Sequence, residues 1–205
     1  MQDPVLITKN TYDAVAEEYS RRNLDNTTLP KKNMGAFISF LKERNYHSVL
    51  DVGCGNGRDA KYFSEQGIEV LGVDSCNSLL DIAKSIAPHA NFVAMDMRNL
   101  EKILSSSFGG VWGSSSFLHV PKSDAVSTLA GFRRVLMPNG ILYLSVKRGN
   151  SEELSSAVYN SPRFFANYEL SDFKKLITEN GFNILTDLDY ATNPKWVGLI
   201  AEKRR

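Results

Sequence analysis

Three alternating glycines form the part of this sequence best suited to close contact with a ligand. They are Gly53, Gly55 and Gly57, in the run Val49-Leu-Asp-Val-Gly-Cys-Gly-Asn-Gly-Arg58. Glycine lets the backbone turn sharply and approach a ligand with no Cβ in the way. We expect the run to join the end of a strand to the start of a helix, whose free N–H groups and positive dipole end face the ligand.

Two aspartates follow at the ends of the next two predicted strands. Asp74 closes one strand and Asp96 closes the other. Taken alone, Asp74 is typical of an acid near a helix N-cap, and Asp96 of a solvated loop acid. Taken with the glycines, they lie at the carboxyl edge of an open α/β sheet, where such sheets bind ligands. There Asp74 can accept both hydroxyls of a ribose, Asp96 can accept from an adenine amino group, and Met97 can contact the ring.

The glycine run also invites comparison with the dinucleotide fingerprint G-x-G-x-x-G. Counted from Gly53, the last position of that fingerprint falls on Arg58 rather than on glycine or alanine. A nicotinamide-dependent oxidoreductase is therefore disfavoured.

The elements that must position these residues alternate between strand and helix periodicity over residues 34–147. Near-continuous apolar strands between amphipathic helices indicate a parallel sheet covered on both faces. A turn is expected at Pro138–Gly140, before the last of these strands. Helices are predicted at residues 34–43, 58–66, 78–87 and 122–136, and strands at 48–52, 68–73, 91–95, 110–114 and 141–146.

The C-terminal region departs from this alternation. A helix over 169–180 ends at Gly181, a residue suited to a helix C-terminus. Strand-like runs at 182–190 and 196–202 follow, and the segment between them is too short for a parallel crossover. The predicted fold class is therefore α/β: a Rossmann-like, seven-stranded, mostly parallel sheet with helices on both faces and a C-terminal antiparallel hairpin.

Length and composition set further limits. The chain has 205 residues, enough for one α/β domain, and its net charge of +1 gives no overall field to attract nucleic acid or an anionic membrane. Two cysteines and three scattered histidines show no metal-ligand spacing, so no metal is expected. The sequence shows neither a membrane-spanning apolar run nor a signal-peptide pattern, which favours a reduced, cytoplasmic location.

Together these features resemble the class I S-adenosylmethionine-dependent methyltransferases. Leu50–Gly57 resembles their first motif, Val73-Asp74 the ribose-binding acid, and Met95–Met97 the adenine-contacting stretch; Leu136–Ile141 and the terminal hairpin also match. The resemblance implies S-adenosylmethionine as cofactor and S-adenosylhomocysteine as product. It implies cofactor contacts from Tyr19, Arg21, Asp51, Gly53, Cys54, Gly55, Asn56, Gly57, Asp74, Ser75, Asp96, Met97 and Ser114.

The resemblance also divides the single predicted domain, 1–205, into three parts. Residues 1–33 form an N-terminal lid, 34–147 the cofactor-binding core, and 148–205 the acceptor-side segment with the hairpin. In the lid, a helix over Thr11–Ser20 carries Tyr12, Val15 and Tyr19 on one face, before a breaker-rich segment from Asn23 to Pro30. Such a stripe is equally typical of side chains packed on a core.

Methyl transfer needs an aligned acceptor and exclusion of water, and a base only when the acceptor is protonated. His119, just after the fourth predicted strand, is the candidate catalytic base and acceptor contact; the alternative is a histidine that only shapes its loop.

The same loop disfavours several classes of methyltransferase. The run Ser114–Phe117 differs from the Asn/Asp-Pro-Pro-Tyr of enzymes that methylate exocyclic amines of DNA bases. Protein arginine methyltransferases are disfavoured because no glutamate occurs between Val111 and Pro121, and catechol-type metal sites because no clustered acids are apparent.

The acceptor side is expected to begin at Lys147 and to continue through the aromatic run Tyr159–Tyr168. Arg163 can bind a carboxylate or phosphate through its guanidinium fork, and Tyr168 with the neighbouring phenylalanines can wall an apolar pocket. Those rings can equally roof the sheet.

The predicted function is methyl transfer to a small-molecule acceptor through an oxygen or nitrogen nucleophile. Two alternatives stay open: a tRNA or RNA base methyltransferase, which the near-neutral charge disfavours, and a non-catalytic S-adenosylmethionine-binding protein. The sequence determines neither the acceptor nor the oligomeric state.

Overall fold

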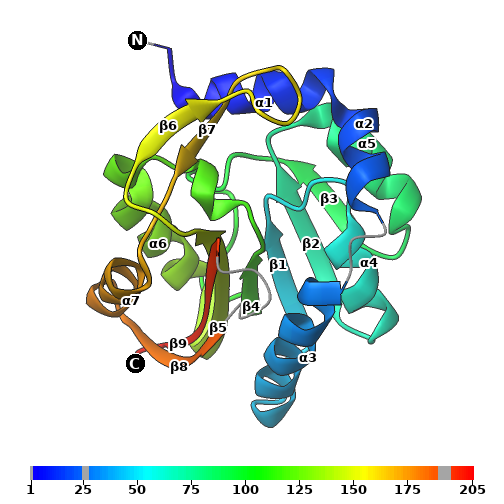
Figure 1. The fold of residues 1–205 in the computed structure, drawn as a ribbon. Coiled ribbons are helices and arrows are strands. Elements are labelled where there is room, and N and C mark those ends of the chain that lie inside the picture. Colours follow the sequence, from blue (N-terminus) through cyan, green and yellow to red (C-terminus); the bar gives the residue numbers. More distant parts are fainter. Residues whose placement is uncertain (1, 25–27, 189–194) are drawn as a thin grey trace.

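A seven-stranded sheet organises the chain in the order β3-β2-β1-β4-β5-β9-β8 (Figure 1). The computed structural model describes residues 2–24, 28–188 and 195–205, with no side chains described for 28–31. All neighbouring pairs from β3 to β5 are parallel, and β9 runs antiparallel to both β5 and β8. The strands are β1 (Ser48–Val52), β2 (Glu69–Asp74), β3 (Asn91–Ala94), β4 (Phe108–Gly113), β5 (Leu136–Lys147), β8 (Phe182–Leu188) and β9 (Trp196–Lys203).

Alternate strand residues bury opposite faces of this sheet, as the period of two requires. Val49 and Trp112 pack with helices on one face, whereas Leu50 and Val111 pack with helices on the other. The first face is covered by α3 (Thr28–Glu43) and α4 (Arg58–Glu65), with α5 (Asn77–Ile86) beside α4; the second is covered by α6 (Lys122–Val135) and α7 (Leu170–Glu179). The predicted fold class is confirmed. Within the described ranges, no helix is long and apolar enough to cross a membrane.

Two of the predicted boundaries in the core are wrong. The turn expected at Pro138–Gly140 lies inside β5, where the pairing of β4 with β5 shifts register and Asn139 has a φ of 57°. A local bulge inside β5 thus replaces the turn expected before this strand. The α3 helix begins at Thr28 rather than near residue 34, which places Pro30 in its first turn, where proline is tolerated.

The C-terminal hairpin forms as predicted from the short connection. β8 pairs with β9 over Phe182–Leu188, and Gly181, directly after α7, has a φ of 89°. Asp189 and Tyr190, which belong to the first strand predicted for this hairpin, lie outside the described residues.

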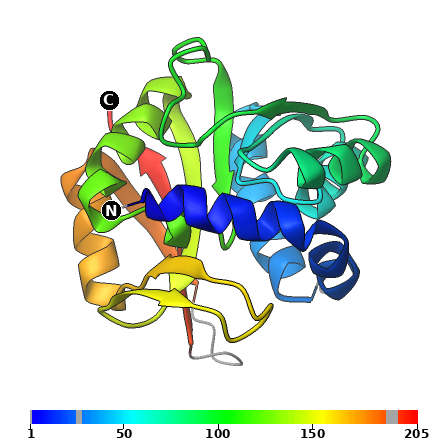
Figure 2. The ribbon, with the colours of Figure 1, turned by 90° about the horizontal axis from the view of Figure 1, so that it is seen from above.

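The N-terminal segment forms two helices rather than the single predicted one. The helix breaks at Val15, between α1 (Pro4–Ala14) and α2 (Ala16–Asn23). The α1 helix begins where Asp3 accepts a hydrogen bond from the N–H of Val5, with Pro4 at the first helical position. Figures 1 and 2 show α1 lying across the edge of the sheet at which the parallel strands end.

A second, two-stranded sheet holds α1 in place and was not predicted. It consists of β6 (Glu152–Ser155) and β7 (Arg163–Ala166), which are antiparallel. Thr8 accepts a hydrogen bond from the N–H of Phe164 at 2.9 Å, and Thr11 donates one to the carbonyl of Pro162 at 2.5 Å. The α1 helix is therefore tied by side-chain hydrogen bonds to β7 and to the residue that precedes it.

Candidate active site

The glycine loop turns directly after β1 and packs tightly on both sides. Gly53 and Gly55 have φ values of 71° and 54°, which residues other than glycine rarely adopt. A Cβ on Gly53 would lie 2.4 Å from the Cβ of Ser116, and one on Gly55 would lie 3.4 Å from the hydroxyl of Tyr19. At Gly57 a Cβ would come within 2.9 Å of the Cβ of Ala83, so this glycine serves a different purpose and lets α4 approach α5.

Asp74 is held beside this loop by two backbone hydrogen bonds, and its carboxylate oxygens can accept more. One carboxylate oxygen accepts the N–H of Gly55 and the other accepts the N–H of Cys76, each at 2.9 Å. Burial raises the pKa of Asp74, while the two backbone hydrogen bonds oppose that rise. Each carboxylate oxygen accepts more than one hydrogen bond, so both can still accept from a ligand diol.

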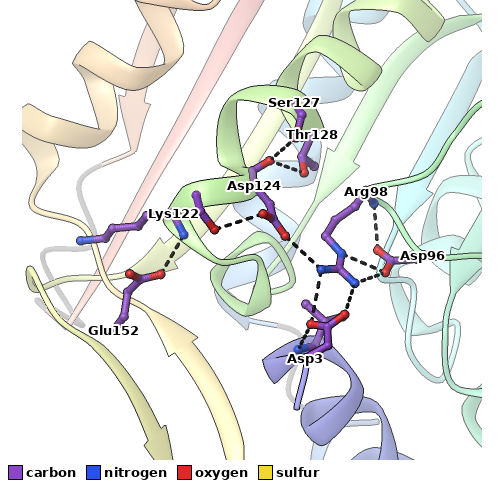
Figure 3. Close-up of polar contacts among 10 residues, drawn as sticks. Asp3, Asp96, Arg98, Lys122, Asp124, Ser127, Thr128 and Glu152 are labelled. Carbon is purple, nitrogen blue, oxygen red and sulfur yellow. Dashed lines mark hydrogen bonds and ion pairs between the residues drawn. The ribbon is translucent and has the colours of Figure 1, made fainter. Parts of the chain in front are cut away.

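Asp96 is held by Arg98 at the end of β3. Its carboxylate accepts from the backbone N–H of Arg98 at 2.9 Å and from the guanidinium at 2.7 and 2.9 Å. The same guanidinium also binds Asp3 at 2.7 Å and Asp124 at 3.0 Å (Figure 3). This cluster joins the start of α1, the end of β3 and the first turn of α6, so the predicted adenine contact and α1 share one cation.

Asp51 lies beneath the loop and lacks a partner on one side. Its side chain is buried, and Oδ2 has no hydrogen-bond partner among the described residues. Burial raises the pKa of Asp51 well above its usual range, and the nearby Asp59 adds to this effect. Asp59 itself pairs with Arg58 at 2.7 Å and accepts the indole N–H of Trp112 at 2.9 Å. A buried carboxylate oxygen without a donor is a place where a ligand amino group would be stabilised.

A cavity at the end of the strands brings most of the predicted cofactor residues together. Arg21 lies apart, exposed on α2, because it faces away from Tyr19 on the same helix. Cys54 and Asn56 are buried in the loop, Asn56 donating to the hydroxyl of Ser20 at 3.1 Å. Asp51 and Gly57 also lie behind the lining. The predicted residues that line the cavity are Tyr19, Gly53, Gly55, Asp74, Ser75, Asp96, Met97 and Ser114.

One wall of this cavity was missed because it comes from α1. Val5, Thr8, Lys9 and Tyr12 line it from above. Tyr12 belongs to the predicted aromatic stripe, and its ring meets that of Tyr19 edge-on, with centroids 5.2 Å apart. Val5, Thr8 and Lys9 precede the predicted helix Thr11–Ser20, so the hydrophobic periodicity of that helix did not include them.

His119 lies at the far end of the cavity, in the short helical turn Phe117–His119. Its Nδ1 is 2.6 Å from the carbonyl oxygen of Phe164, and its Nε2 is 3.1 Å from the hydroxyl of Tyr12. Because a carbonyl only accepts, Nδ1 carries the proton and Nε2 accepts from Tyr12. Burial lowers the pKa of His119 to about 4, and the charges of Arg163 and Lys147 contribute to the shift.

A second cavity, with a volume of about 340 Å³, opens beyond His119 and has the size of a small-molecule site. Arg163 and Lys147 line it, together with Tyr159, Phe165 and Trp196. Tyr168 does not, because it follows β7 and is buried against Phe117 and Phe173. The two cavities share five lining residues: Tyr12, Tyr19, Ser114, Ser115 and His119.

Comparison with known proteins agrees with this geometry. Residues 49–140, which contain the glycine loop and both aspartates, match a family model described as a methyltransferase domain. Over this segment the chain is similar to the methyltransferases, and it shares its fold with S-adenosylmethionine-dependent members of that family. S-Adenosylmethionine is the cofactor of this family, and among the described residues no cluster of metal-ligating side chains occurs.

Three individual proteins illustrate the relationship. The methyltransferase GfsG of Streptomyces halstedii is 27% identical over 72% of this chain and 58% of its own length, and a malonyl-[acyl-carrier protein] O-methyltransferase of Pseudescherichia vulneris is 28% identical over 63% of this chain and 51% of its own. The chain thus spans little more than half the length of these two relatives. Magnesium protoporphyrin IX methyltransferase from Synechocystis, crystallised with S-adenosylmethionine, shares the fold with a TM-score of 0.77 at 16% identity, over 99% of this chain and 98% of the other.

The residues of the first cavity fit that cofactor. Asp74 offers lone pairs for the ribose, and Asp96 follows the next strand where an adenine amino group is expected. Asp51, behind the lining, has a buried oxygen that lacks a donor. Close packing around Gly53 leaves no room for a side chain in the loop. The three carboxylates suit a ligand rich in donors, which the hydroxyls and amino groups of S-adenosylmethionine provide.

Proposed function

We propose that this methyltransferase transfers the methyl group of S-adenosylmethionine to a small-molecule acceptor through an oxygen or nitrogen nucleophile. The observation that carries the proposal is the junction of two cavities at Tyr12, Tyr19 and His119. One cavity carries the residues expected to bind the cofactor, and the other has the volume of a small-molecule site. Their shared lining residues mark the place where a methyl group would pass from one to the other.

Bound S-adenosylmethionine supplies an electrophilic methyl group. On the chain's side, Asp74 and Asp96 orient the nucleoside, while Gly53 and Gly55 let the backbone approach it. The α1 helix covers the junction, which keeps water from the reacting atoms. Such chemistry depends mainly on alignment of donor and acceptor.

His119 suits a positioning role better than that of a general base. Its Nε2 lone pair is occupied by the hydroxyl of Tyr12, and its lowered pKa makes it a weak proton acceptor at neutral pH. It links α1 to β7 through Tyr12 and the carbonyl of Phe164. The name of the malonyl-[acyl-carrier protein] O-methyltransferase among the relatives supports oxygen as the acceptor atom.

An acceptor screen tests the proposal. The purified chain is incubated with S-adenosylmethionine and fractionated small-molecule extracts, or with total tRNA, and release of S-adenosylhomocysteine is measured. We expect release with a small-molecule fraction, at a rate insensitive to moderate salt, and much slower release from Asp74→Ala at the same cofactor concentration. Release with tRNA alone, falling steeply with salt, would instead identify an RNA methyltransferase. No release with any fraction, despite tight cofactor binding, would point to a non-catalytic binding protein.

A further inference from the structure

The acceptor cavity contains a buried arginine without a carboxylate partner. Arg163 on β7 is 8% exposed, and its Nη1 donates a hydrogen bond to the hydroxyl of Tyr12 at 3.0 Å. Its Nε is buried with no partner among the described residues. The guanidinium lies against three rings, with Cζ 4.7 Å from the centroid of Tyr159, 5.1 Å from Phe165 and 5.4 Å from Tyr12. The rings hold the charge in place but do not neutralise it.

A second cation approaches the same place from the end of β5. The Nζ of Lys147 lies 3.7 Å from the ring centroid of Phe165 and makes no ion pair among the described residues. Burial and the charge of Arg163 lower the pKa of Lys147. The carboxylate that opposes this shift, Glu153, lies outside the cavity and accepts from Asn167 at 3.2 Å.

Other arginines whose side chains are largely buried have carboxylate partners, whereas Arg163 and Lys147 have none among the described residues. Arg98 binds three carboxylates, Arg44 pairs with Glu202 at 2.7 Å, and Arg58, which also lines the acceptor cavity, pairs with Asp59. No aspartate or glutamate occurs among the described residues that line the cavity. A buried charge without a counter-charge is unfavourable, so Arg163 and Lys147 would be stabilised by a bound anion.

The side chains at the junction leave no nitrogen free to act as a general base. The hydrogen bonds run in one direction, from Arg163 to the hydroxyl of Tyr12, from that hydroxyl to Nε2 of His119, and from Nδ1 of His119 to a carbonyl. Both ring nitrogens of His119 are therefore occupied. An acceptor that must lose a proton would find no base at this histidine, whereas one that arrives as an anion needs none.

We propose that the acceptor is a carboxylic acid, bound as its carboxylate by Arg163 and Lys147 and methylated on a carboxylate oxygen. This inference rests on the proposed function and names its substrate class. Carboxylic acids are ionised at neutral pH, and the Nε edge of a guanidinium matches a carboxylate. A lone pair of the carboxylate oxygen forms the new bond to the methyl carbon, the S–CH₃ bond breaks, and its electron pair stays on the sulfur. No proton is released, and the product is a methyl ester.

Labelled transfer to matched acceptors tests the proposal. The chain is incubated with S-adenosylmethionine carrying a labelled methyl group and a panel of aromatic and aliphatic carboxylic acids, each paired with its primary amide. We expect label from acids at a rate at least tenfold above their amides, and recovery of that label as volatile methanol after mild alkali, which cleaves methyl esters. Transfer only to other small molecules, or alkali-stable label, overturns the carboxylate acceptor and leaves the proposed function standing. Absence of transfer to the panel and to small-molecule extracts alike overturns both.

Variants that remove a charge test whether Arg163 and Lys147 bind the carboxylate of the acceptor. Arg163→Gln and Lys147→Gln should each lower kcat/KM for the best acid about tenfold, with cofactor affinity unchanged within about twofold. Lys102→Gln, which removes an exposed lysine that lines neither cavity, is the matched control. Arg163→Lys keeps the charge without the fork and should retain more activity than Arg163→Gln, which guards against a simple folding defect. Equal acid-to-amide preference in Arg163→Gln and the parent contradicts the assignment.

Discussion

The two cavities that meet at His119 are built from different chemistry. The cofactor cavity is lined by Asp74, Asp96 and backbone of the glycine loop, whereas the acceptor cavity is lined by Lys147, Arg163 and aromatic rings. The first therefore suits a ligand rich in hydrogen-bond donors, and the second suits an apolar ligand with negative charge. Under the proposed function, this contrast would let one sheet edge hold a cationic donor and its acceptor side by side.

The two cavities also differ in how they are assembled. The glycines and acidic groups of the first come from the carboxyl ends of β1, β2 and β3, while α1 and the segment after β4 add the rest of its lining. The second collects groups from α1, the end of β5, β7 and the start of β9, which are far apart in sequence. Local motifs encode the cofactor side, and long-range packing creates the acceptor side.

Asp74→Ala should produce the largest effect, on the cofactor side alone. Loss of a carboxylate that accepts two backbone hydrogen bonds and the ribose should weaken S-adenosylmethionine binding about a hundredfold, measured by calorimetry. Asp81→Ala, on the exposed face of α5, is the control and should bind like the parent. Unchanged affinity in Asp74→Ala would remove the basis for the cofactor assignment.

Gly53→Ala should destabilise the fold by about 2 kcal/mol, because its φ is positive and the new Cβ would meet Ser116. Gly131→Ala is a matched control on α6, where a Cβ meets nothing within 4 Å; there alanine should stabilise by about 0.5–1 kcal/mol. Chemical denaturation of both variants measures the difference. Equal stabilities would mean that the loop is not held as tightly as the contacts require.

His119→Gln should change how stability depends on pH. The pKa of His119 is about 4 in the folded chain and about 6.5 when unfolded, so the unfolded state binds more protons between these values. The histidine's contribution is fully present above pH 6.5 and is lost as the pH falls toward 4. The parent should therefore lose more stability than His119→Gln over this window, in urea denaturation at stepped pH. Parallel curves would contradict a neutral, buried ring.

Asp3→Asn should have the smallest effect, because its ion pair with Arg98 is partly exposed. Asparagine at position 3 still caps α1 but carries no charge. The free energy needed to open α1 should therefore fall by up to about 1 kcal/mol. Hydrogen exchange of α1 amides measures this opening, and the difference from the parent should shrink at high salt. Asp3→Ala, which also loses the cap, should exchange faster still. Identical exchange in Asp3→Asn and the parent would show that Arg98 does not hold the lid.

The sequence predicted the cofactor side better than the acceptor side for physical reasons. Gly53 and Asp74 are recognisable because strand ends place them and their spacing is local. The four-residue strands β6 and β7 carry too little periodicity to predict, and their attachment to α1 depends on Thr8 and Thr11. The burial of Tyr168 away from the second cavity was not predictable for the same reason, since only the path of the chain after β7 turns it into the core.

A crystal structure of the chain with S-adenosylhomocysteine and a carboxylic acid would test the division between the two cavities directly. We expect the ribose hydroxyls on Asp74, the sulfur facing the junction of Tyr12 and His119, and the carboxylate within hydrogen-bond distance of Arg163. A nucleoside bound away from Asp74, or an acid bound away from Arg163 with that cavity empty, would contradict this division.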